Sequence, residues 1–95
     1  MTPHEIIVRP VVTEKTTDLQ ADANQYVFEV AKKANKIEIR KAVEMVFGVR
    51  VWKVRTQVVR GSLRRVGTHW GRRPSWKKAI VTLHPDDTID LYGEE

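Results

Sequence analysis

The residues with the clearest chemical character lie in one stretch of the chain, from Arg60 to Lys78. It contains seven Lys or Arg residues, no Asp or Glu, and two tryptophans, Trp70 and Trp76. Guanidinium groups bind phosphates through paired hydrogen bonds, and aromatic rings offer flat surfaces on which unpaired bases stack. This combination predicts a surface that binds a nucleic acid, because so polar a stretch cannot form an ordinary apolar core element.

The candidate RNA-binding side chains of this stretch are its cations, its tryptophans and one histidine: Arg60, Arg64, Arg65, His69, Trp70, Arg72, Arg73, Trp76, Lys77 and Lys78. For His69, stacking or a phosphate contact fits the basic surroundings better than metal ligation. Trp70 is placed near the expected tip of the stretch, where it can face an unstacked base. Trp76 and Trp52 are expected on strands, so packing on the sheet is an equally good interpretation for both.

The basic residues are segregated along the chain. Residues 1–44 carry seven basic and seven acidic side chains, 45–85 carry ten basic and no acidic ones, and 86–95 carry five acids and no base. The net charge of +5 therefore hides a strongly positive region, as is typical of nucleic-acid-binding proteins. A short basic run is often only a solvated surface, but 41 consecutive residues without an acid favour the binding interpretation.

Two further cations, Lys36 and Arg40, fall on the outer side of an expected helix. A solvated helix face is the simpler interpretation for them, and auxiliary phosphate contacts are the alternative that we retain.

Residues for catalysis are not grouped in this sequence. The three histidines are far apart and lack a metal-ligand spacing such as HExxH, and cysteine is absent. The cluster of Asp86, Asp87 and Asp90 predicts a capped turn rather than a cation site. We therefore expect no enzymatic activity, no metal, no cofactor and no small-molecule substrate.

Length and hydropathy limit the possibilities further. A chain of 95 residues suits one domain, which buries roughly 60–65% of its unfolded surface. No apolar run approaches the about 18 residues that span a bilayer, and the N-terminus lacks the pattern of a signal peptide. We expect a soluble intracellular protein without membrane insertion.

Short helices are expected near the N-terminus. Thr2, Pro3 and Glu5 form a capping pattern, and Pro10 limits this helix to about two turns. A second short helix is expected from Thr13 to residue 19, followed by a polar turn at 21–24.

The clearest helix lies between Asn35 and Gly48. Its apolar residues recur at the spacing of one helix face, Asn35 and Glu38 form a capping box, and Gly48 supplies a left-handed stop.

Alternating residues predict strands at 26–30, 49–59 and 76–83. The apolar parity shifts between Val51 and Trp52, which indicates either a bulge or that Val49 belongs to the helix-to-strand turn. The last two strands should form a long hairpin with the basic stretch at its tip.

The fold class predicted from these elements is α+β, with a small antiparallel sheet packed with helices and a long basic hairpin loop. Residues 1–95 are expected to form a single RNA-binding domain that includes an extended loop at 60–78. Beyond the hairpin, Ile89 and Leu91 should add a short strand or a docked tail.

Several segments, in chain order, resemble the family of bacterial-type large-subunit ribosomal protein twenty-three. They are Arg9-Pro10-Val11-Val12-Thr13-Glu14-Lys15, Tyr26-Val27-Phe28-Glu29-Val30, Ala34-Asn35-Lys36-Ile37-Glu38-Ile39, Gly71-Arg72-Arg73 and Trp76-Lys77-Lys78-Ala79. The similarity covers essentially the whole chain, and Trp70 and Pro74 depart from the family's pattern.

The resemblance implies a structural protein of the large ribosomal subunit in the cytoplasm. Its expected partners are large-subunit rRNA beside the polypeptide exit tunnel, neighbouring large-subunit proteins, trigger factor and the signal recognition particle. The family's chaperone-docking glutamate corresponds to Glu14, which its position alone would explain as a first-turn acid favoured by the helix dipole. The alternative is a nucleic-acid-binding regulatory or architectural protein that acts outside the ribosome.

Overall fold

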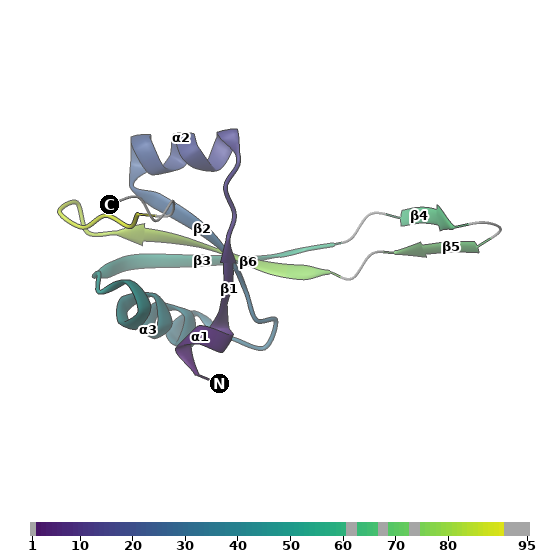
Figure 1. The fold of residues 1–95 in the computed structure, drawn as a ribbon, viewed down its shortest axis with the longest axis horizontal. Coiled ribbons are helices and arrows are strands. Elements are labelled where there is room, and N and C mark those ends of the chain that lie inside the picture. Colours follow the sequence, from purple (N-terminus) through teal and green to yellow (C-terminus); the bar gives the residue numbers. More distant parts are fainter. Residues whose placement is uncertain (1, 61–62, 67–68, 73–74, 91–95) are drawn as a thin grey trace.

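A computed structural model of the chain describes residues 2–60, 63–66, 69–72 and 75–90 (Figure 1). The described elements are, in order, α1 (Pro3–Ile6), β1 (Ile7–Pro10), α2 (Glu14–Ala23), β2 (Gln25–Val30), α3 (Lys36–Phe47), β3 (Val51–Val59), β4 (Leu63–Val66), β5 (His69–Arg72) and β6 (Trp76–Leu83).

The strands form a four-stranded sheet in the order β1-β2-β6-β3 and a separate two-stranded ladder of β4 and β5. Every neighbouring pair is antiparallel. Figure 1 shows α1 and α3 on one side of the larger sheet and α2 on the other. The predicted α+β class, with helices packed on a small antiparallel sheet, is confirmed.

The predicted boundaries of α3 are confirmed at both ends. The Asn35 side chain accepts a hydrogen bond from the Glu38 backbone N–H at 2.8 Å, and the Glu38 carboxylate accepts one from the Asn35 N–H at 3.2 Å. Gly48 ends the helix with φ 64°, a left-handed conformation that costs glycine little because it has no Cβ.

The main hydrophobic core lies between α3 and one face of the sheet. Phe28 is fully buried and its ring stacks on that of Phe47, with centroids 5.4 Å apart. Burying one such side chain contributes about 1.5–3 kcal/mol. The buried residues of this core are Ile6, Tyr26, Phe28, Val30, Ala34, Ile39, Ala42, Val43, Val49, Val51, Ala79, Val81, Leu83 and Ile89. The alternation predicted for β2 and β6 and the apolar face predicted for α3 therefore agree with this core.

The prediction for the N-terminal segment is wrong in part. Helix α1 spans four residues only, and the following residues form β1. Strand β1 is held by pairing with β2, where Arg9 Nε lies 2.7 Å from Glu29 Oε1. Pro10, which lacks an N–H, is tolerated because β1 is an edge strand. A four-residue edge strand has too little alternation to be recognised without its partner.

Two other predicted boundaries differ from the structure. Helix α2 continues to Ala23, and Asn24 caps it with φ 51°, so the predicted polar turn is shorter than expected. Ile89 is buried and its backbone N–H donates to the Tyr26 hydroxyl at 3.1 Å. It docks without joining a strand, whereas Leu91 lies outside the described residues.

The parity shift near Trp52 is a β-bulge. Val51 pairs with Leu83 and Lys53 pairs with Thr82, so Trp52 is the extra residue on β3. Because of this insertion, Val51 and Val54 both face α3 although they are three residues apart.

The turn after β6 is fixed by Asp87. Its Oδ2 accepts hydrogen bonds from the Arg50 backbone N–H at 2.6 Å and from Arg50 Nε at 3.2 Å, and Oδ1 accepts one from Nη2 at 3.3 Å. The Asn24 amide donates to the backbone oxygens of His84 and Asp87 at 3.0 and 2.9 Å. These contacts join the C-terminus of α2, the start of β3 and the end of β6.

The Arg50 side-chain hydrogen bond, followed by the Arg50 backbone hydrogen bond, holds the pKa of Asp87 below its ordinary value, and desolvation opposes this only in part. A carboxylate with a lowered folded pKa stabilises the fold above its unfolded pKa, about pH 4, and loses that contribution as the pH falls through the folded pKa. The Asp87 contacts are therefore present at neutral pH and weaken in acid.

We expect Asp87→Asn to lower the urea midpoint of unfolding at pH 7, and the difference from wild type to shrink as the pH is lowered below about 4. The measurement is urea unfolding of both proteins across this pH range. Asp86→Asn, a change at the neighbouring exposed residue, is the matched control. A difference between Asp87→Asn and wild type that stays constant with pH would contradict the linkage.

Candidate nucleic-acid interface

The basic stretch forms an arm that projects from the body of the protein. In Figure 1, β3 and β6 run out of the body together and lead toward the β4–β5 ladder. The radius of gyration is 15.0 Å, whereas a compact chain of this length has about 12 Å. The long hairpin predicted from the sequence is therefore the feature that makes the protein elongated.

The β4–β5 ladder brings several of the predicted RNA-binding residues together. It pairs Arg65 with Trp70, Arg64 with Gly71, and Arg72 with Leu63, and His69 lies opposite Val66. The structure thus establishes which backbone positions of β4 and β5 lie opposite one another. The predicted contact Arg73 lies outside the described residues.

The base of the arm separates Lys77 from its neighbours. Lys77 lies on the α3 side of the sheet, where its Nζ donates to the Ala34 carbonyl at 2.5 Å. Trp76 and Lys78 lie on the other side, where they line a groove beneath α2 together with Ile80. Both Trp76 and Lys78 are half-buried, whereas Arg60 is exposed. Lys77 thus has a structural contact, while Lys78 and Arg60 keep their charges at the surface.

Sequence reasoning left Lys53 and Arg55 out of the candidate site. Both are exposed on β3: Arg55 pairs with Ile80 on the α2 side, whereas Lys53, which follows the irregularity in the ladder and pairs with Thr82, borders a groove toward α3. They continue the basic surface from the arm onto the body. The signal that could have found them is the period-two alternation of Lys53, Arg55 and Gln57 within an acid-free segment.

The cations of this surface whose side chains the structure describes form no ion pair with a described acid. Within the part of the chain that the structure describes, the ion pairs are Arg9 with Glu29, Arg40 with Glu44 and Arg50 with Asp87. Lys53, Arg55, Arg60 and Lys78 form none of them. Clustered cations without acids repel one another, and binding a polyanion relieves this repulsion while releasing the counter-ions of the polyanion.

Lys36 and Arg40 lie on the exposed side of α3 next to β3. They line a shallow groove of about 150 Å³ together with Ile37, Trp52, Lys53 and Val54. Arg40 Nε lies 4.0 Å from Glu44 Oε1, a loose i,i+4 pair. The structure thus connects these two cations with Lys53 of β3, which the sequence had placed on a separate element.

Glu14 is the first residue of α2 and is exposed. Thr13 caps the helix, accepting a hydrogen bond from the Thr16 N–H at 3.2 Å. An acidic side chain is favoured in the first turn by the helix dipole, so its position is consistent with both interpretations given above.

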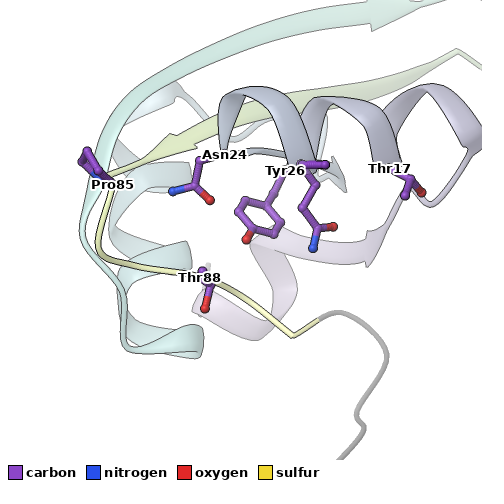
Figure 2. Close-up of a pocket in the computed structure, with 7 residues that line it drawn as sticks. Thr17, Asn24, Tyr26, Pro85 and Thr88 are labelled. Atoms are coloured by element: carbon purple, nitrogen blue, oxygen red, sulfur yellow. The ribbon is translucent and has the colours of Figure 1, made fainter.

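A pocket of about 470 Å³ lies away from the basic surface, between α2 and the turn that follows β6. Figure 2 shows Tyr26 and Asn24 on one side of it and Thr88 on the other. Its lining contains no charged side chain, and the Tyr26 hydroxyl already accepts a hydrogen bond from the Ile89 N–H. The lining thus offers hydroxyl and amide groups with no charged acid or base among them.

Two further features are absent from the described residues. No group of three or more His, Asp or Glu side chains that could hold a metal ion occurs there. No helix in that part of the chain is long and apolar enough to span a bilayer.

Comparison with known proteins gives a consistent answer over nearly the whole chain. Residues 5–91 match the family model described as ribosomal protein L23. The large ribosomal subunit protein uL23 of Roseiflexus castenholzii is 52% identical over 92 residues, which cover 97% of each chain. That of Syntrophotalea carbinolica is 50% identical over 90 residues, 95% of each chain. The chain therefore belongs to the ribosomal protein L23 family.

Proposed function

We propose that residues 1–95 act as one rRNA-binding unit whose arm and adjoining strand bind large-subunit rRNA near the polypeptide exit tunnel. Family membership makes the chain a structural, non-enzymatic constituent of the large ribosomal subunit, which is cytoplasmic in bacteria. The proposal adds which surface meets the RNA and where it lies.

The observation that carries this proposal is the continuity of unpaired positive charge. The predicted contacts Arg60 and Lys78, together with Lys53 and Arg55, form no ion pair with any described acid. They lead from the sheet to the ladder that contains Arg64 and its neighbours. An RNA backbone can follow such a continuous line of cations, with each neutralised phosphate adding to affinity.

The shape of the arm supports an RNA partner over a flat protein surface. A narrow two-stranded ribbon can enter a gap between RNA helices, and its guanidinium groups can then reach phosphates on both sides. The half-buried Trp76 supports the sheet at the arm's base, whereas Trp70, paired with Arg65, remains the proposed stacking residue.

We expect the triple change Arg64→Gln, Arg65→Gln and Arg72→Gln to weaken binding to a large-subunit rRNA fragment. Each lost phosphate contact should reduce the slope of log K against log salt by about 0.7–0.9, so three lost contacts should reduce it by about two units or more. Filter binding over a salt series measures this. Lys15→Gln, Lys32→Gln and Lys41→Gln, three exposed cations outside the arm, form the control with the same charge change.

The corresponding test in cells is sedimentation of tagged protein on sucrose gradients. Wild type and the control variant should migrate with large subunits in moderately high salt, and the arm variant should be depleted from them. Wild-type protein that stays at the top of the gradient, bound to another nucleic acid, would favour the non-ribosomal alternative.

We also propose that Glu14 contributes to docking of trigger factor and of the signal recognition particle. This proposal is supported by the exposed position of Glu14 at the start of α2, where Glu14 forms no ion pair with a described cation. An unpaired surface carboxylate is available to a cationic side chain of a partner.

Glu14→Lys should weaken trigger factor binding to purified ribosomes about tenfold or more, which corresponds to about 1.4 kcal/mol, because a charge attraction becomes a repulsion. Co-sedimentation with trigger factor measures the affinity, and subunit assembly should stay normal because the residue is exposed. Asp18→Lys, one turn later on the same helix and also exposed, is the control. Equal losses for both variants would mean that net charge, rather than Glu14 itself, determines docking.

A further inference from the structure

Trp52 is an exposed tryptophan at the bulge of β3. Trp52 is 68% exposed, and Ile37 of α3, which lines the same groove, is 66% exposed. Tryptophan usually buries a large apolar area or finds a partner for its ring. Two large apolar residues left open side by side therefore indicate a surface that is covered in the assembled state.

The bulge removes Trp52 from the residue-by-residue pairing of β3 with β6. Val51 and Lys53 take the positions opposite Leu83 and Thr82, and Trp52 has no opposite residue in the ladder. Bulges often redirect a side chain at a functional position. Here the redirected ring lies in the groove between β3 and α3 instead of on the flat face of the sheet.

The cations around this ring identify the partner's charge. Lys36, Arg40 and Lys53 line the same groove as Trp52, and its lining contains no acidic residue. Glu44 of α3 has one carboxylate oxygen 4.0 Å from Arg40 Nε, and its other oxygen accepts a hydrogen bond from the Val51 N–H at 3.1 Å. The groove thus combines an aromatic face with a positive field.

We propose that this groove binds one unpaired nucleotide of RNA, whose base stacks on Trp52 while Lys36, Arg40 and Lys53 contact the flanking phosphates. The proposal rests on the proposed function of rRNA binding and adds a second contact region away from the arm. Stacking on an aromatic ring requires only the face of the base, so the site accepts any unpaired base and excludes a base held within a duplex.

An apolar segment of a protein is the other occupant that such a surface could take. The charges disfavour it, because a partner without negative charge would cover Lys36 and Lys53, which form no ion pair with a described acid, and Arg40, whose pair with Glu44 is loose. A nucleotide provides both an aromatic base that can stack on Trp52 and phosphates that can pair with the cations, and so matches both features of the groove.

The first test compares binding of single-stranded oligoadenylate RNA and of duplex RNA of equal length to the full chain. Trp52→Ala should weaken single-strand binding about 5- to 150-fold, the range for loss of one base–aromatic stack, with little change for the duplex. Trp52→Phe should keep most of the affinity, whereas Trp52→Leu, which is apolar but has no π-face, should behave like Trp52→Ala. Val58→Ala, at another exposed apolar residue of β3, is the matched control and should bind like wild type.

These results separate the groove from the rest of the interface. If Trp52→Leu binds single strands as tightly as wild type, the ring does not stack on a base and the proposal is overturned. If Trp52→Ala matches wild type while the arm variant loses affinity, the groove proposal fails and the proposed function stands. If wild type itself binds neither RNA nor large subunits, the proposed function fails first.

A second measurement identifies the occupant within the ribosome. Photoreactive benzoyl-phenylalanine at position 52, in protein assembled into large subunits, should crosslink to rRNA. Crosslinks to a neighbouring protein alone would overturn the proposal in favour of an apolar protein contact.

Discussion

The antiparallel pairing of β3 with β6 is the interaction on which the rest of the structure depends. It runs from Val51 opposite Leu83 in the core to Val59 opposite Trp76 at the base of the arm. At one end its residues are buried beneath α3, and at the other its strands leave the body. The free energy gained by burying the core end therefore also holds in register two strands whose cations would otherwise repel one another.

The same ladder divides the cations between surfaces with different roles. Successive side chains of a strand alternate between faces, so Lys77 contacts the loop before α3 while Lys78 lies on the α2 side. The bulge at Trp52 shifts this alternation once. It allows β3 to keep Val51 and Val54 in the core and also to present a tryptophan beside α3.

One acid of the C-terminal part, Asp87, is engaged in a local contact. Its carboxylate holds Arg50 and the turn after β6, and that turn lies at the end of the sheet opposite the arm (Figure 1). The arm and the middle of β3 keep their positive potential as a result. A protein that used its own acids to neutralise its cations would gain little, since exposed ion pairs contribute about 0–1 kcal/mol, and would lose affinity for RNA.

The sequence by itself determined the class of partner, the long hairpin, helix α3 with both caps, and the inward faces of β2 and β6. These follow from local signals: charge composition, period-two and period-3.6 patterns, and capping residues. Only the tertiary structure decided that residues 7–10 form a strand, that Lys77 contacts Ala34, and that Trp52 joins Lys36 and Arg40 in one groove. Each of these depends on contacts between residues far apart in the chain, and no local pattern encodes which distant surface a short edge strand, a long lysine or a bulged ring will meet.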